Sequence, residues 1–249
     1  RAGLDIVAIG DSLAMVSYGH PNTLPATVDL MLEHCRAVRR GAPNTFSLVA
    51  MPYGSYANPA IAVQNALRFM KEGSVDCVKM QGGRAQMPII KAIADAGVPV
   101  MSHVGMCPHF VHKYGGFKLQ GRTAEDALQI IDDACAIQEA GAIGLEIEAV
   151  PAPVGRAVHE AVDIFTFSIG AGPSGCAQLL LAFDLLGVFD QFKPKFTKRY
   201  ANLSQVAVEA LKTYAAEVRD GVFPDAEHSY GMQPDEVAKL EARLGKALR

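Results

Sequence analysis

The chain has 249 residues, half of them hydrophobic and one fifth charged, which is enough to bury the core of one barrel or of two smaller domains. Its formal net charge of -3 argues against a nucleic acid or an anionic membrane as partner, because both attract concentrated positive charge. No run approaches the roughly 18 consecutive apolar residues of a membrane-spanning helix. The five cysteines are far apart and mostly in apolar surroundings, which is typical of a reduced cytoplasmic protein.

Six apolar runs follow one another along the chain, and several end in polar residues or glycines. The first is DIVAIGDSL, which begins at Asp5 and closes in a Gly-Asp-Ser turn. Segments with helical spacing separate it from the others, which are FSLVAMP, DCVKMQGG, VPVMSHVGM, IGLEIEAVP and IFTFSIGAG. Strands that are apolar on both faces and alternate with helices predict a buried parallel sheet.

The remaining segments depart from this alternation of strands and helices. A long loop, CPHFVHKYGGFKLQGR, follows the fourth run, and loops of this length on barrels usually carry function or form a lid. After the sixth run, CAQLLLAFDLLG predicts a helix and VFDQFKPKF a short seventh strand. Two further segments, residues 203–221 and 234–249, predict accessory helices.

We therefore predict an α/β fold, a (β/α)8 TIM barrel that forms a single domain over residues 1–249. The βα units occupy about residues 1–200 and the accessory helices residues 203–249. The apolar faces of these helices exceed what an outer ring needs, so we expect them to pack between the subunits of a homo-oligomer. Because a strand follows Arg1 almost at once, we expect the first strand of the barrel to come from a segment before Arg1 or from a partner.

Asp11 and Ser12 stand at the end of the first strand. A carboxylate there can ligate a hard cation, and a hydroxyl or a backbone N–H can bind a substrate carboxylate. The alternative is a simple helix cap after the strand. The sequence alone leaves both interpretations open.

Lys79 and His103 lie within apolar strand runs. An amine inside a barrel needs an anionic partner, so Lys79 favours a functional role. His103 is either a second functional group or a histidine satisfied within the core.

Glu146 and Glu148 alternate along the strand LEIEAV, so their carboxylates point to the same face. If that face lines the barrel, Glu148 is the natural general base, because it lies nearer the carboxyl end of the strand. If it is the outer face, both are ordinary solvated charges. The apolar neighbours Leu145, Ile147 and Ala149 favour the interior.

Other motifs are weak. The chain holds no phosphate-binding loop and no strict dinucleotide fingerprint, since a strand end explains IGAGPSG equally well. The remaining histidines show no metal-ligand spacing. They are His20, His34, His109, His112, His159 and His228.

Long, ordered motifs carry a family resemblance from about Gly3 to Tyr230. They are GDSLAMVSYGH, NTLPATVD, AVRRGAPN, YANPAIAVQNA, VKMQGG, VPVMSHVGM, GGFKLQGR, AIQEAG, LEIEAVP, IGAGP, KPKF and GVFPDAEHSY. The chain resembles the 3-methyl-2-oxobutanoate (ketopantoate) hydroxymethyltransferase family. The resemblance implies a (β/α)8 barrel, a bound Mg2+, a large homo-oligomer, and one-carbon transfer from 5,10-methylenetetrahydrofolate to an α-keto acid in pantothenate and coenzyme A biosynthesis.

The resemblance also implies roles for single residues. Asp11 matches the metal-binding aspartate and Ser12 the keto-acid-binding serine, so both belong to the expected substrate site. Lys79 and His103 match further substrate-site groups, and Glu148 matches the catalytic base. In this scheme the metal polarises the keto oxygen, Glu148 removes the proton from the adjacent carbon, and the enolate attacks the methylene donor.

Two departures fall on the metal site. The chain reads VAMPY, with Ala50, where the family has a metal-contacting aspartate in patterns such as ADLPF. It also places Gln81 where the family has a glutamate two residues after the lysine. Only Asp11 and the neutral oxygen of Gln81 remain as ligands, so we expect poor magnesium affinity. The segment IGAG departs too, with Ser168 for a usual glycine.

Three functions are compatible with these residues. The first is the family reaction on 3-methyl-2-oxobutanoate with weakened metal dependence. The second is a related barrel enzyme that activates another α-keto acid through Lys79 and Glu148 with weak or no metal dependence, and the third is a catalytically silent paralogue. Retention of Asp11, Ser12, Lys79 and Glu148 together favours an active enzyme.

Overall fold

The computed structural model describes residues 2–248, which form a curled sheet of parallel strands with helices on its outer side. Each strand pairs with the next in chain order, as β1-β2-β3-β4-β5-β6-β7. The strands are β1 (Ile6–Ile9), β2 (Phe46–Ala50), β3 (Cys77–Lys79), β4 (Val100–Gly105), β5 (Gly144–Glu148), β6 (Phe165–Ile169) and β7 (Ala177–Gln178). Within the described residues this is a (β/α)8 barrel that lacks one strand. The strand expected before Arg1 lies outside the described residues.

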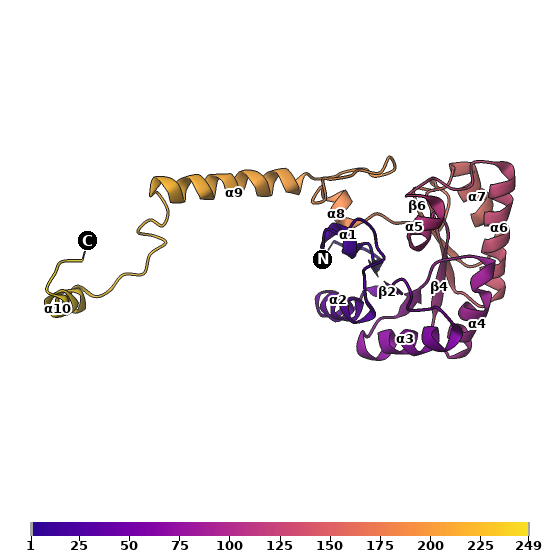
Figure 1. Ribbon diagram of the computed structural model, residues 1–249, viewed down its shortest axis with the longest axis horizontal. Coiled ribbons are helices and arrows are strands. Elements are labelled where there is room, and N and C mark those ends of the chain that lie inside the picture. Colours follow the sequence, from indigo (N-terminus) through magenta and orange to yellow (C-terminus); the bar gives the residue numbers. More distant parts are fainter. Residues whose placement is uncertain (1, 249) are drawn as a thin grey trace.

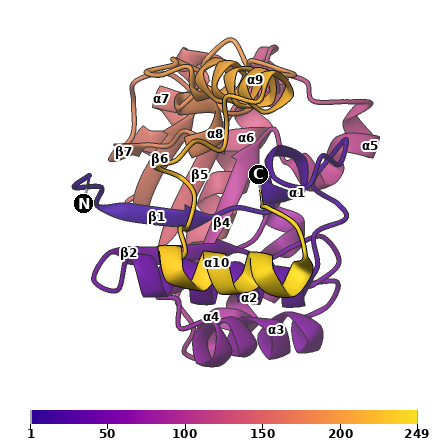
Figure 2. The same cartoon turned by 90° about the vertical axis from the view of Figure 1, so that its left-hand side faces the viewer.

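Helices connect successive strands from β1 to β6 and cover the convex side of the sheet (Figures 1 and 2). The longer ones are α2 (Val28–Gly41), α3 (Pro59–Glu72), α4 (Met87–Asp95), α6 (Ala124–Glu139) and α7 (Ala152–Ala161). The short ones are α1 (Leu13–Val16), α5 (Val111–Tyr114), α8 (Ala182–Leu185) and the 3-10 turns η1 (Arg84–Gln86) and η2 (Pro108–Phe110).

Side-chain caps fix where three of these helices begin. Thr27, Asn58 and Thr123 each accept a hydrogen bond from the backbone N–H three residues further on. Each cap satisfies one of the otherwise unpaired N–H groups of the first turn and contributes about 1 kcal/mol. The strand-to-helix loops therefore end at defined points, which fixes the path of the chain at the carboxyl edge of the sheet.

Two apolar layers hold the sheet. The larger lies between the strands and the helices, and Leu145 and Ile147 of β5 belong to it with Ile137 of α6. The smaller consists of Leu48, Cys77, Met101 and Phe167, one from each of β2, β3, β4 and β6. Side chains alternate along a strand, so Glu146 points away from the helix layer, into the barrel. The interior position predicted for this glutamate pair is therefore confirmed.

The sequence located six strands correctly but misplaced the seventh. The predicted strand VFDQFKPKF has no regular structure, and β7 instead falls at the start of the predicted helix CAQLLLAFDLLG, which contains only the one-turn α8. The backbone N–H groups of Cys176 and Leu179 bond to the carbonyls of Thr166 and Ser168 on β6. This pairing with β6 overrides the helical spacing of the segment.

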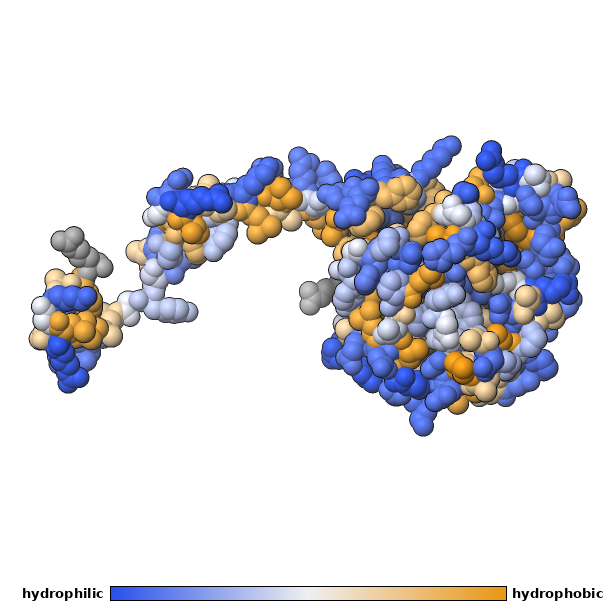
Figure 3. Space-filling model, viewed as in Figure 1, coloured by the Kyte–Doolittle hydropathy of each residue, from blue (hydrophilic) through white to orange (hydrophobic). Residues whose placement is uncertain are grey.

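Beyond Asn202 the chain leaves the barrel. Helix α9 (Leu203–Asp220) extends away from it and leads to α10 (Pro234–Leu244), and neither helix has a buried residue (Figure 1). Hydrophobic side chains are visible along α9 in the space-filling view (Figure 3). Both accessory helices were expected from the sequence. Among the described residues, no helix combines the length and apolarity needed to cross a membrane.

Candidate active site

Charged side chains gather at the carboxyl edge of the sheet, above the smaller apolar layer. Lys79 ends β3, His103 lies in β4, and Glu146 and Glu148 lie in β5. The register pairs His103 with Glu146, and places the last residue of β2, Ala50, beside Lys79. Because neighbouring parallel strands present paired residues on the same side, these groups face one another inside the barrel.

Lys79 and Glu146 form a buried ion pair in which Nζ donates to Oε2. The two side chains expose only 10% and 3% of their surface. Burial alone lowers the pKa of Lys79, but the Glu146 carboxylate outweighs burial and raises it. Burial conversely raises the pKa of Glu146, but Lys79 and then His103 hold it below its usual value. Both partners are therefore charged at neutral pH.

His103 lies between the two carboxylates of β5. Its Nδ1 is 3.6 Å from Oε1 of Glu146, and its Nε2 is 3.3 Å from Oε2 of Glu148. The imidazole is 1% exposed, and neither nitrogen has the alignment of a hydrogen bond. Burial raises the pKa of Glu148, while the neighbouring His103 acts in the opposite direction. A carboxylate with a raised pKa is suited to act as a general base.

A second buried group links three distant parts of the chain. Nε2 of His109, in η2, donates to Oδ2 of Asp11 across 2.5 Å, and its Nδ1 is hydrogen-bonded to the hydroxyl of Tyr56. The rings of Tyr56 and His109 stack with centroids 5.7 Å apart. Burial raises the pKa of Tyr56, so its hydroxyl stays protonated. The carboxylate of Asp11 thus already has a basic partner.

Gln81 holds the same histidine from the backbone side. Its Oε1 accepts the backbone N–H of His109 at 3.0 Å. Gln81 and Ala50 are each 2% exposed, so both positions that the family resemblance assigns to metal ligands are buried. The side chain of Gln81, however, is used to fix η2.

Ser12 follows Asp11 and precedes α1 without capping it, since its side chain makes no cap hydrogen bond. The structure thus brings Lys79, His103, Glu146 and Glu148 into one cluster and pairs Asp11 with a residue of the loop after β4. The spacing of His109 in the sequence did not indicate a metal ligand, and no sequence pattern indicated a role for Tyr56. The one signal that pointed to His109 was the length of its loop.

His103, Glu146 and Glu148 each offer a donor atom, and these atoms lie within 4.8 Å of one another. A histidine with two carboxylates suits several transition metals. Lys79, however, is already ion-paired with Glu146, and its positive charge would repel a metal cation at this position.

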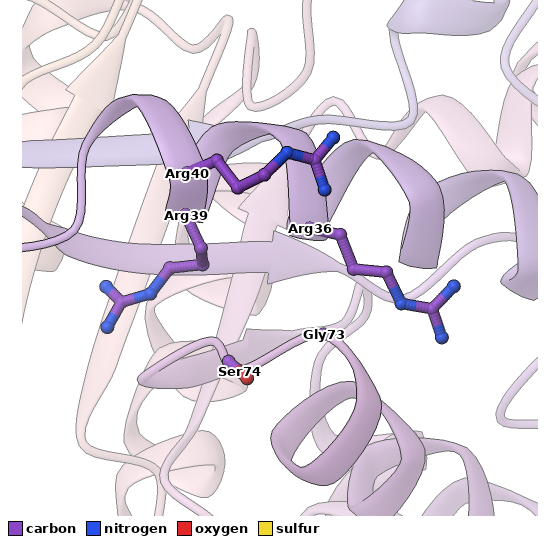
Figure 4. A pocket seen from close by; sticks show the side chains of 5 residues that line it. All are labelled: Arg36, Arg39, Arg40, Gly73 and Ser74. Carbon is purple, nitrogen blue, oxygen red and sulfur yellow. The ribbon is translucent and has the colours of Figure 1, made fainter.

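A separate hollow of 330 Å³ lies near the amino ends of β2 and β3, away from these residues (Figure 4). Arg36, Arg39 and Arg40 line it together with Gly73 and Ser74. Arg36 is paired with Glu33 and Glu72, and Arg39 with Asp76. The pairs with Glu72 and Asp76 join α2 to α3 and to the segment before β3, so we interpret these arginines as structural.

Comparison with known proteins reveals close relatives. A profile described as Ketopantoate hydroxymethyltransferase matches residues 1–226. The 3-methyl-2-oxobutanoate hydroxymethyltransferase 1 of Methylibium petroleiphilum is 55% identical over 235 residues, which is 94% of this chain and 80% of that protein. The enzyme of that name from Thermus thermophilus is 46% identical over 229 residues, covering 92% of this chain and 88% of the relative.

Solved structures share the fold at low sequence identity. A crystal structure titled oxaloacetate acetylhydrolase aligns with a TM-score of 0.57 at 14% identity, over 98% of this chain and 86% of that one. A putative lyase/mutase from Burkholderia cenocepacia aligns with a TM-score of 0.54 at 19% identity, over 97% of this chain and 84% of that one. These likenesses support the barrel fold.

Proposed function

The chain belongs to the ketopantoate hydroxymethyltransferase family, and from this premise we propose how it carries out one-carbon transfer. The substrate is 3-methyl-2-oxobutanoate, the one-carbon donor is 5,10-methylenetetrahydrofolate, and the product is 2-dehydropantoate for pantothenate and coenzyme A biosynthesis. The names and identities of the relatives support this reaction over another α-keto acid or a silent paralogue.

The observation that carries the mechanism is the position of Glu148, whose side chain is 13% exposed at the carboxyl edge of the barrel. Its raised pKa makes it a stronger base than an exposed glutamate. Glu148 takes the proton from the carbon next to the keto group, and the enolate forms a bond to the methylene carbon of the folate as one of the two C–N bonds of that carbon breaks. Water replaces the second C–N bond and supplies the hydroxyl oxygen. Tetrahydrofolate leaves with the proton from Glu148 and one from water on its two nitrogens.

The neighbouring groups hold the keto acid. The hydroxyl of Ser12 is free of a capping bond and stands beside Asp11, where it can donate to a substrate oxygen. Lys79 supplies positive charge opposite a substrate carboxylate, and Glu146 keeps that lysine charged and in place. His103 lies between Glu146 and Glu148, where it acts to lower the pKa of the base. Asp11, Ser12, Lys79 and His103 thus remain the proposed binding residues.

Magnesium, which the family resemblance implies, does not fit the residues present. Ala50 has no donor atom, and the side-chain oxygen of Gln81 is bonded to the backbone of His109. Asp11 is the one carboxylate left at this position, and it is paired with the His109 ring. A hard dication needs several free oxygen ligands, so no step of the reaction is assigned to it.

Assembly and location are part of the same proposal. The exposed apolar residues of α9, among them Val206 and Leu211 at 65% exposure each, support a homo-oligomer in which this helix packs on another subunit. Five free cysteines support a cytoplasmic location. The partners are small molecules, the α-keto acid and the folate, rather than nucleic acid or membrane.

Proton exchange tests the central step. The purified chain, incubated in D2O with 3-methyl-2-oxobutanoate and no folate, should replace the hydrogen on the carbon next to the keto group. Glu148→Gln should abolish this exchange, while the exposed control Glu125→Gln should not. Exchange with a different 2-keto acid and none with this one would instead favour the related barrel enzyme.

A further inference from the structure

The structure assigns to His109 the place beside Asp11 that a divalent cation would take, and we propose that the site works without magnesium for this reason. The inference rests on the proposed function for the keto acid at this site, but the position of His109 does not depend on it. It concerns a residue that the motifs did not single out.

The carboxylate of Asp11 needs a partner of its own. Lys79 is the ammonium of the site, and it is ion-paired with Glu146. Asp11 is buried, and a buried carboxylate is strongly unfavourable unless it is paired or hydrogen-bonded. A divalent cation could fill the place beside Asp11, and so could a hydrogen-bond donor.

The ring of His109 is this donor. Its Nε2 donates to Oδ2 of Asp11. The other polar groups packed around His109 are Tyr53, Tyr56 and Gln81. The imidazole therefore satisfies the carboxylate that a cation would otherwise bind.

Three contacts lock His109 in this position. Asp11 holds Nε2, Tyr56 holds Nδ1, and Gln81 holds the backbone N–H. A cation at Asp11 would have to displace the ring and break the first two of these contacts. Gln81, the residue that could offer a neutral ligand, is bound to the very segment that blocks the site.

This arrangement explains how the keto oxygen can be activated. Negative charge develops on that oxygen when Glu148 removes the proton, and a fixed hydrogen-bond donor nearby stabilises it. His109 holds Asp11 in place next to Ser12, whose hydroxyl can donate to that oxygen. We describe His109 as a positioning residue, because both ring nitrogens are engaged by protein groups.

Magnesium titration by calorimetry tests the proposal on the full chain. The parent should show no binding at millimolar Mg2+, and its proton exchange should persist in EDTA. His109→Gln should slow exchange roughly 100-fold without rescue by Mg2+, whereas His112→Gln, an exposed histidine of the same loop, should not. Added imidazole should restore exchange in His109→Ala.

A designed metal site separates the effect of His109 on Mg2+ affinity from the effect of the two absent carboxylates. Ala50→Asp with Gln81→Glu should bind Mg2+ poorly while His109 remains, and the triple variant that adds His109→Gln should bind it at least about tenfold more tightly. Thermal melts of each variant show whether it is folded.

The results distinguish this inference from the proposed function. Tight Mg2+ binding by the parent, or exchange that EDTA abolishes and Mg2+ restores, would overturn the inference while leaving the reaction intact. A parent that neither binds Mg2+ nor exchanges the keto acid would overturn the reaction, and the calorimetry of the triple variant would still decide whether His109 excludes the metal. Equal binding by the double and triple variants would refute that exclusion.

Discussion

Lys79 donates a hydrogen bond to Glu146 inside the barrel, from β3 to β5 across the intervening β4. The pair therefore ties together three adjacent strands whose helix-facing residues belong to the larger core. Breaking it leaves one buried charge without its counterion.

Removing one partner should be worse than removing both. Glu146→Gln should lower the free energy of unfolding by about 3–5 kcal/mol, because Lys79 is left buried and unpaired. The double variant Lys79→Met, Glu146→Leu should lose less, since neither charge remains. Urea unfolding of both variants measures these changes in the free energy of unfolding. A double variant that is less stable than Glu146→Gln would contradict the prediction.

Low pH should lower the stability of the parent protein through protonation of Glu146. The pKa of Glu146 is below its usual value in the folded protein, so the folded state gains stability from this group at pH values above the unfolded pKa of about 4.3. That gain is lost as the pH falls through the folded pKa. In Glu146→Gln the loss of stability below this pH should be smaller, and unfolding midpoints measured between neutral and acid pH give the comparison.

Catalysis should depend on a deprotonated Glu148. Its pKa is raised, so the acid limb of kcat/KM should lie above the usual glutamate value of about 4.3. Since His103 acts to lower this pKa, His103→Gln should move the limb to higher pH. Glu148→Gln should reduce turnover by about 10²- to 10⁴-fold. An acid limb that stays in place in the His103 variant would argue against this coupling.

Gly105 should tolerate no side chain. It ends β4 with φ of +89°, and an added Cβ would lie 2.2 Å from the backbone oxygen of Glu148. Gly105→Ala should therefore displace the base strand and reduce both stability and proton exchange, whereas Gly97→Ala, with a positive φ but open space, should affect stability alone. Thermal melts and exchange rates report the two effects separately.

The apolar surface of α9 should mediate assembly. Light scattering should return a mass well above the 26.5 kDa of one chain. Val206→Glu together with Leu211→Glu should shift the protein toward the monomer, because charge on an apolar interface opposes its burial. Lys212→Glu on the same helix is the matched control. A parent that is monomeric at micromolar concentration would rule the prediction out.

The parts of the fold set by local patterns were predictable. Apolar runs located β1 to β6, and the apolar neighbours of Glu146 placed it inside the barrel, because alternation along a strand needs no long-range information. β7 has two residues, which is too short for any period to identify. Its pairing with β6 decides its structure.

The site was predictable where it lies on strands and obscure where it lies in loops. Lys79, Glu146 and Glu148 were found because charges within apolar strands are unusual. His109 belongs to a 3-10 turn, and its partner Asp11 lies 98 residues away in the chain. No short sequence pattern links His109 to Asp11. The two residues meet only because the loop after β4 folds back over the end of β1.

The contact between Tyr56 and His109 gives this protein an optical signal of its own. The chain has seven tyrosines and no tryptophan, so its ultraviolet emission comes from phenol rings alone. A phenol hydrogen-bonded to an imidazole and stacked on it loses emission, and Tyr56 is in this state. A ligand that draws the imidazole away should brighten the protein, and occupancy could then be followed without a label.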